Sequence, residues 1–222
     1  MVLNQKTILD NRLRNDAKYY QECFSVGLKY YNGEVFEQNY KKAFMWFEKS
    51  AQGSNINAQI MLGCMYYEGC GVEINYEKSF FYFEECAKKD NKQGLYFAGL
   101  MYREGQGIDI DYKRAYLYFN KAAQKGVADA YFRLGEMYFD GLYVAQDYEQ
   151  GLELFKESAR QGYVYAQLEL AAMHCHGIYV KKDLKEANKW CEMVLAQNNE
   201  FYNNVLKENK IIEILGKDIA QN

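Results

Sequence analysis

A motif of eleven residues returns along this chain at a constant interval of 36 residues. Its copies read VGLKYYNGEVF from Val26, LGCMYYEGCGV from Leu62, AGLMYREGQGI from Ala98, LGEMYFDGLYV from Leu134 and LAAMHCHGIYV from Leu170. A fixed period of this length is typical of repeat architectures, in which neighbouring units share one core. A loop that occurs five times is therefore a structural element and no unique active site.

Each unit is expected to fold into two helices. Apolar residues recur at steps of three and four, as in Ala58, Met61, Leu62 and Met65, and strand-like alternation is lacking. A short polar residue precedes each second helix and is expected to accept a hydrogen bond from a free backbone amide, a cap that contributes about 1 kcal/mol. These N-cap residues are Asn39, Asn75, Asp111, Asp147 and Asp183.

Two glycines of the motif have different predicted roles. The later one follows the first helix, where a positive φ ends the helix without a Cβ penalty, at Gly33, Gly69, Gly105, Gly141 and Gly177. The earlier one lies inside that helix and costs up to about 1 kcal/mol against alanine. Because four copies keep it, we expect the paired helix to approach closely at Gly27, Gly63, Gly99 and Gly135.

The whole pattern resembles the Sel1-like repeat family, a close relative of the tetratricopeptide repeat. The resemblance rests on a small residue, Leu-Gly, Tyr, a Gly-x-Gly loop, an Asx, a small residue, an aromatic and a closing Ala-x-x-Gly, and it covers roughly Tyr19 to Asn198. The first copy departs from it at Val35, and the fifth at Ala171 and His174. Membership implies a right-handed superhelix of antiparallel helix pairs whose inner wall binds other proteins.

We therefore predict an all-α fold, an α/α solenoid in one domain. Its parts are a lead-in at 1–18, repeats at 19–54, 55–90, 91–126, 127–162 and 163–198, and a capping helix at 199–222. The lead-in is either frayed or a short cap helix. The cap is predicted from Phe201, Val205, Leu206, Ile211, Ile212, Ile214 and Leu215.

Composition excludes several classes of function. The net charge of −3 and the lack of Lys/Arg runs argue against nucleic acid. No stretch is apolar enough for a membrane span or a signal peptide, so we expect a cytoplasmic protein. We also expect a monomer. Reduced to the 36-residue period, the cysteines occupy six registers, which rules out the disulfide that secreted relatives repeat. A single Cys70–Cys86 or Cys175–Cys191 bond stays open, with free thiols favoured.

The candidates for chemistry have simpler interpretations. Gly69-Cys70-Gly71 resembles a phosphate loop, but a helix precedes it where that loop needs a strand, so a turn is favoured. Successive residues of His174-Cys175-His176 point about 100° apart on a helix and cannot share one metal ion. No catalytic triad or acid pair stands out. We predict no metal, no cofactor and no enzymatic activity.

The tetratricopeptide analogy indicates which first-helix positions face the groove. The rows are Phe24, Ile60, Tyr96, Phe132 and Leu168; Leu28, Cys64, Leu100, Glu136 and Ala172; and Tyr31, Tyr67, Arg103, Phe139 and Cys175. Apolar and aromatic side chains on such a surface are usual anchors for a protein partner. The alternative is that packing between repeats buries them.

An acidic ladder, Glu68, Glu104 and Asp140, would form the rim of this groove. These carboxylates end their helices, where the helix dipole disfavours negative charge. A basic partner or a neighbouring Lys would explain them, and a solvated family preference is the simpler interpretation.

We conclude from the sequence that the chain is a non-enzymatic protein-binding module, an adaptor or scaffold. An immunity protein that masks a bacterial toxin is the alternative. An enzyme of the cysteine-rich, penicillin-binding and β-lactamase-like branch is a weaker third, because its disulfide register is missing.

Overall fold

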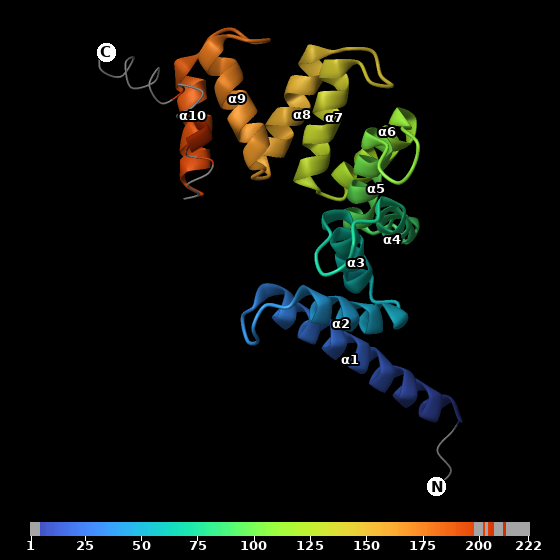
Figure 1. Ribbon diagram of the computed structural model, residues 1–222. Coiled ribbons are helices and arrows are strands. Elements are labelled where there is room, and N and C mark those ends of the chain that lie inside the picture. The colour runs from blue at the N-terminus through green and yellow to red at the C-terminus, as the bar shows by residue number, and fades with distance from the viewer. Residues whose placement is uncertain (1–4, 198–201, 203, 207–210, 212–222) are drawn as a thin grey trace. The chain divides into compact units, whose positions relative to one another are not determined.

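The computed structural model describes residues 5–197, 202, 204–206 and 211, with side chains from Asp16 onward (Figure 1). Its helices are α1 (Gln5–Asn32), α2 (Tyr40–Gln52), α3 (Ile56–Glu68), α4 (Tyr76–Lys88), α5 (Lys92–Glu104), α6 (Tyr112–Gln124), α7 (Ala128–Asp140), α8 (Tyr148–Arg160), α9 (Val164–His176) and α10 (Leu184–Leu195). The described residues contain no strand. The predictions of an all-α fold and of repeated helix-turn-helix units are confirmed.

The helices belong to two compact units, Met1–Tyr118 and Phe119–Asn222, and α6 spans their boundary. In the first unit α1 packs on α2, α2 on α3, α3 on α4 and α4 on α5; in the second, α7, α8, α9 and α10 pack in the same sequential way. Within each unit these helices therefore contact their neighbours in the chain, as expected for stacked hairpins. The single domain and the superhelix stay predictions.

The two ends of the chain extend the repeats. The predicted lead-in is helical from Gln5 and continues without a break into the first repeat as α1. At the other end, Leu206 and Ile211 are buried in the same cluster as Trp190. The predicted cap residues Phe201, Ile212, Ile214 and Leu215 lie outside the described residues.

The predicted caps are all present. The side chains of Asn39, Asn75, Asp111, Asp147 and Asp183 each accept a backbone N–H from the first turn of the following helix. At the end of α3, Gly69 has φ +75° and its amide donates to the Met65 carbonyl. These local contacts start and stop the helices where the sequence predicts.

The glycines also set how closely elements approach. A Cβ at Gly63 would lie 2.5 Å from the ring of Phe83, which confirms the predicted helix contact, and Gly27 and Gly135 face Phe47 and Phe155 in the same way. A Cβ at Gly71 would lie 2.5 Å from the backbone of Tyr40, at the start of α2. Gly69-Cys70-Gly71 is therefore a turn, as predicted, and it packs on the preceding repeat.

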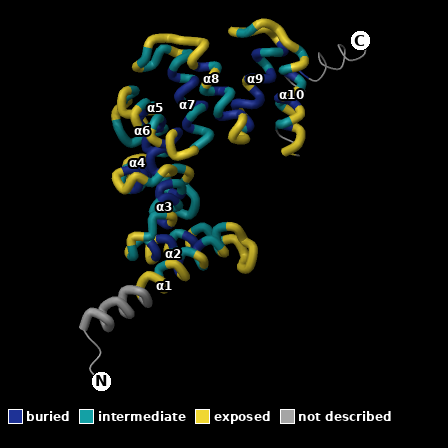
Figure 2. Tube along the Cα trace, turned by 180° about the vertical axis from the view of Figure 1, so that it is seen from behind, coloured by how far each residue is buried: buried dark blue, intermediate teal, exposed yellow. Residues whose placement is uncertain are grey.

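Apolar side chains fill the space between paired helices, while the loops that follow α1 and α9 are mostly exposed (Figure 2). In the first unit the central cluster is Ala43, Phe47, Ala58, Leu62 and Met65. No described helix is long and apolar enough to cross a membrane.

Candidate functional site

A cavity of about 130 Å³ opens in the first unit between α3, α4 and α5. It is lined by Cys64, Tyr67, Glu68, Phe83, Phe97, Leu100 and Met101. Phe83 is buried and stacks on Phe97, with ring centroids 4.7 Å apart and planes 21° apart. The second helix thus supplies an aromatic floor, and the last turns of two first helices supply the walls.

Three predicted groove positions meet in this cavity. Cys64 and Tyr67 come from α3 and Leu100 from α5, and all three are half-buried. The sequence did not point to Phe83, Phe97 and Met101, because the tetratricopeptide analogy names only selected first-helix positions. The available signal was Gly63, because a glycine inside the first helix predicts a close approach of the paired helix, and the structure places the Phe83 ring there.

The ring of Tyr67 is held in place on two sides. It packs edge-on against Tyr76, with centroids 5.4 Å apart, and its hydroxyl donates a long hydrogen bond of 3.4 Å to Oε2 of Glu104. Burial and the nearby Glu104 carboxylate raise the pKa of Tyr67. These two contacts orient the Tyr67 side chain.

Tyr31 repeats this arrangement one repeat earlier. Its ring packs edge-on against Tyr40, with centroids 5.1 Å apart. Burial, and then the charge of Glu68, raise its pKa to about 12. Glu68 and Glu104 thus each lie near the tyrosine 37 residues earlier in the chain. The neighbouring tyrosines explain two members of the acidic ladder.

The cysteines of this site are poor nucleophiles. Burial, and then Glu68, raise the pKa of the Cys64 thiol to about 12, and the Cys70 thiol donates to Glu68 at 3.5 Å. A thiol with so high a pKa stays protonated at neutral pH. All six cysteines of the chain are free thiols in the structure, the interpretation favoured from sequence.

The first predicted row lies mostly in the core. Ile60, Tyr96, Phe132 and Leu168 have exposed fractions of only 6 to 9%. Phe24 is half-buried, with its ring 5.6 Å from that of Phe47. The burial of the four residues Ile60, Tyr96, Phe132 and Leu168 agrees with the alternative interpretation, in which packing between repeats buries the groove positions.

The predicted residues of the second unit are engaged within that unit. Phe139 is half-buried and packs on Tyr148, Phe155 and Tyr179. Glu136 forms an ion pair with Arg133 at 2.9 Å. Asp140, also in the second unit, is exposed. Arg103 belongs to the first unit, where it lies at the end of α5 and is half-buried. A single groove that joins these residues to the cavity stays a prediction.

The His174-Cys175-His176 segment does not bring three potential metal ligands together among the described residues. His174 is half-buried, Cys175 is buried and His176 is exposed, so the three point in different directions. Burial lowers the pKa of His174, and its ring nitrogens have no hydrogen-bond partner within the described part of the chain. Among those residues no three potential ligands gather.

Comparisons with known proteins agree with this geometry. The sequence model of the Sel1 repeat matches residues 23–55, 56–91, 92–127, 128–163 and 164–199. A comparison with curated protein sequences gave no significant match. Repeats of this family are generally protein-interaction modules and non-catalytic scaffolds.

Three solved structures share the fold. A Sel1 repeat protein from Oxalobacter formigenes is 26% identical, with a TM-score of 0.75 over 89% of this chain and 86% of its own. A protective antigen of uropathogenic Escherichia coli with an SLR fold is 30% identical, with a TM-score of 0.71 over 92% of this chain and 46% of its own, so this chain spans less than half of that protein. An immunity protein from Pseudomonas aeruginosa is 19% identical, with a TM-score of 0.56 over 84% of this chain and 67% of its own, a likeness of fold alone. With five matched repeats over most of its length, the chain belongs to the Sel1 repeat family.

Proposed function

We propose that this protein is a binding module that grips a segment of a partner protein on the first-helix side of its first unit. The observation that carries the proposal is the apolar cavity between α3, α4 and α5, which has an aromatic floor and opens beside oriented tyrosines. A volume of about 130 Å³ is suited to one aliphatic or aromatic side chain. Buried anchors of that kind supply most of the affinity in protein interfaces.

The charges around the cavity would orient the partner. Glu68 and Glu104 are both exposed, and Tyr67 lies between the cavity and Glu104. Exposed carboxylates at a rim affect association rate and specificity more than affinity. We therefore expect the bound segment to place a Lys or Arg beside its apolar anchor.

Selection of a displayed random-peptide library on the full chain tests this proposal. Peptides with an apolar residue next to a basic one should be enriched. Binding of a selected peptide should fall at least about tenfold for Cys64→Trp, whose ring fills the cavity. Glu104→Lys, at an exposed position, should weaken it by a smaller factor and change its salt dependence.

Ile178→Ser is the matched control, because Ile178 is apolar and 50% exposed but lies in the second unit. It should leave peptide binding unchanged. Failure to enrich any peptide would contradict the proposal. So would a peptide whose affinity neither Cys64→Trp nor Glu104→Lys alters, while both variants keep the wild-type melting temperature.

The cellular location, the oligomeric state and the biological role of this module are also proposals. We propose a cytoplasmic, monomeric adaptor, which cell fractionation and sedimentation would test. The immunity hypothesis would gain support if co-expression of the chain rescued cells from a toxin encoded next to it. Hydrolysis of a chromogenic β-lactam by the purified chain would instead favour the enzyme hypothesis.

A further inference from the structure

One register of the repeat changes its chemistry in the fifth copy. Four copies hold a tyrosine near the end of the first helix and the fifth holds a histidine; these residues are Tyr30, Tyr66, Tyr102, Tyr138 and His174. In every copy the backbone carbonyl of this residue accepts the amide N–H of the N-cap residue that starts the second helix, as His174 does from Asp183 at 2.9 Å. The register therefore ties the loop between the two helices to the first helix.

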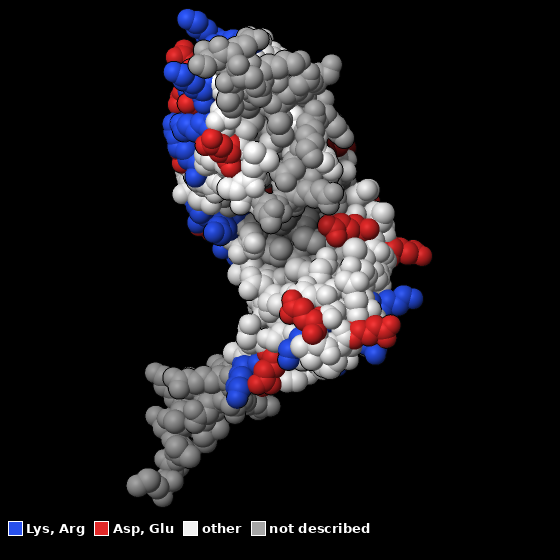
Figure 3. Space-filling model, turned by 90° about the vertical axis from the view of Figure 1, so that its left-hand side faces the viewer, with Lys and Arg blue, Asp and Glu red and all other residues white. Residues whose placement is uncertain are grey.

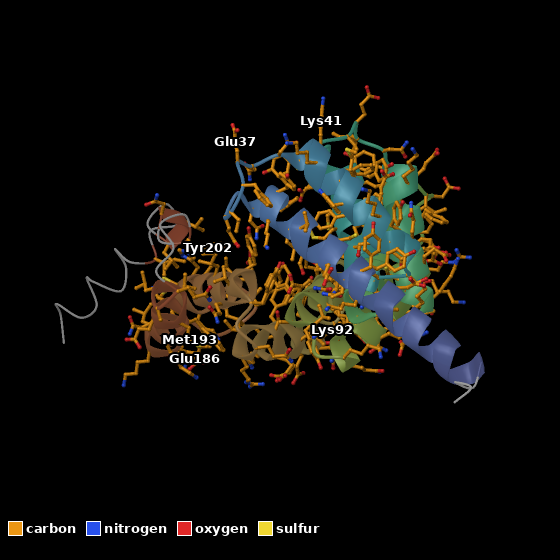
Figure 4. All side chains as sticks on the ribbon, turned by 90° about the horizontal axis from the view of Figure 1, so that it is seen from below. Glu37, Lys41, Lys92, Glu186, Met193 and Tyr202 are labelled. Carbon is orange, nitrogen blue, oxygen red and sulfur yellow. The ribbon has the colours of Figure 1, made fainter. Side chains whose placement is uncertain are left out.

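In the first three copies a cation covers the ring of this tyrosine. The cation is the third residue after the N-cap, and its distances to the ring centroid are 5.3 Å for Lys42 over Tyr30, 5.0 Å for Lys78 over Tyr66 and 5.3 Å for Arg114 over Tyr102. A positive charge is attracted to the face of an aromatic ring. The fourth copy has Gln150 at this position, and the fifth has Glu186, on α10 (Figure 4). The exchange of tyrosine for histidine thus coincides with the exchange of the cation for a carboxylate.

His174 lies against the loop that its carbonyl anchors. Together with residues 180–185 it lines a hollow in the surface of the second unit. The residue is half-buried, yet both ring nitrogens are shielded from water and lack a hydrogen-bond partner among the residues that the structure describes. A neutral imidazole has one donor and one acceptor, whereas a protonated one has two donors. Protonation would therefore place a charge and a further unpaired donor at a shielded position, which is unfavourable.

The carboxylates nearest to this charge are already engaged. Asp183 caps α10 and accepts the backbone N–H groups of Lys185 and Glu186, at 3.0 and 3.1 Å. Glu186 forms an ion pair with Lys189 at 3.1 Å. A protonated His174 would have to draw one of these carboxylates away from its present partner. Either change weakens the first turn of α10, because the cap and the ion pair both hold that turn.

The surroundings of the ring disfavour a positive charge on balance. Burial has the largest effect and lowers the pKa of His174 below its ordinary value of 6.5. The charges that act on the ring are those of Glu186 and Asp183, which raise the pKa, and those of Lys156 on α8 and Lys189 on α10, which lower it. Three exposed lysines also line the hollow, Lys181, Lys182 and Lys185. Figure 3 shows basic side chains gathered along one edge of the second unit, with acidic ones among them.

We propose that His174 makes the fifth repeat acid-sensitive: when its ring is protonated, the loop at 177–183 and the first turn of α10 are released from α9. Because the unfolded chain binds this proton more readily than the folded one, the stability of the repeat is complete above pH 6.5 and is lost as the pH falls below it. One histidine can change the folding equilibrium by at most about tenfold between pH 7.5 and pH 5.5. The device belongs to the second unit and does not involve the cavity of the first.

Urea unfolding followed by the fluorescence of Trp190, in a Trp46→Phe background, tests the proposal. The midpoint should be lower at pH 5.5 than at pH 7.5. His174→Tyr, which restores the residue of the other four copies, should remove most of that fall. The matched control His176→Tyr, at an exposed position two residues later, should retain it. Equal midpoints at the two pH values in the parent chain, or a fall that His174→Tyr leaves intact, would overturn the proposal.

Two further measurements locate the effect. An NMR titration of the unsubstituted chain should place the midpoint of His174 below pH 6.5; a midpoint at or above 6.5 would contradict the proposal, even if His174→Tyr failed to fold. The amides of Asp183, Lys185 and Glu186 should exchange hydrogen faster in the unsubstituted chain than in His174→Tyr, by a larger factor at pH 5.5 than at pH 7.5. The same factor at both pH values would show that protonation does not release the loop.

Discussion

At the scale of single residues, the lack of a side chain at Gly63 decides how α3 and α4 pack. The ring of Phe83 occupies the space where a Cβ would lie, and it also forms the floor of the cavity. One glycine therefore serves both the core and the candidate binding site. The close packing of Phe83 on α3 offsets the low helix propensity of glycine.

Gly63→Ala should destabilise the protein. The new methyl group would lie 2.5 Å from the Phe83 ring, and overpacking of this kind costs about 1 to 3 kcal/mol, against which better helix propensity returns up to about 1 kcal/mol. Urea unfolding followed by circular dichroism measures the difference.

Asn57→Ala, at an exposed position in the same helix, is the control and should stay within about 0.5 kcal/mol. Adding Phe83→Leu to Gly63→Ala should cost less than the sum of the two single changes, because the smaller side chain relieves the collision. An unchanged unfolding midpoint in Gly63→Ala would show that α3 and α4 adjust freely.

At the scale of elements, pairs of a tyrosine and a glutamate join consecutive repeats on both sides of the first unit. On the first helices the acid follows its tyrosine by 37 residues, as in Tyr67 and Glu104. On the second helices it precedes its tyrosine by 34, as in Glu84 and Tyr118. Each pair fixes the register of one repeat on the next, which apolar contacts alone specify less strictly.

A double-mutant cycle of Glu84→Gln and Tyr118→Phe should give a coupling energy of about 1 kcal/mol. Burial and the neighbouring Glu84 raise the pKa of Tyr118 above its ordinary value of 10.0. The unfolded chain therefore loses this proton first, and the stability from the pair should fall as the pH rises above 10. Tyr118→Phe should reduce that fall, and strictly additive single changes would mean that the pair does not couple.

At the scale of the whole molecule, the stability of each repeat depends on its contacts with the neighbouring repeats. Most helices have 12 or 13 residues, a length that is marginal for an isolated helix in water. Stability in such arrays is approximately a sum of terms within repeats and between adjacent ones. The two tryptophans report on opposite ends, because Trp46 lies in α2 and Trp190 in α10.

Gly63→Ala should therefore lower the urea midpoint more for the helices near α2 than for those near α10. In a Trp190→Phe background, fluorescence of Trp46 should show a clear fall of the urea midpoint, since the change lies in the next repeat. In a Trp46→Phe background, the midpoint reported by Trp190 should move less. Equal shifts at both tryptophans would show that the chain unfolds as one cooperative block.

Much of the fold was predictable because its signals are local. The N-cap of Asn75, the positive φ of Gly69 and the approach of Phe83 to Gly63 each involve residues fewer than 25 positions apart, and the 36-residue period repeats them. The site was less predictable. Tyr67 and Tyr96 were assigned to the same groove, yet Tyr67 is half-buried beside a cavity and Tyr96 is buried.

The sequence by itself determined the helical repeats, their caps and their turns, since backbone hydrogen bonds and φ preferences act within one unit. Only the tertiary structure decided which side chains stay accessible, because that depends on how the next repeat covers them. The cavity between α3, α4 and α5 and the exposure of Met45, Phe81 and Leu117 both arise in this way. Exposure is a property of the packed stack, which no single repeat carries.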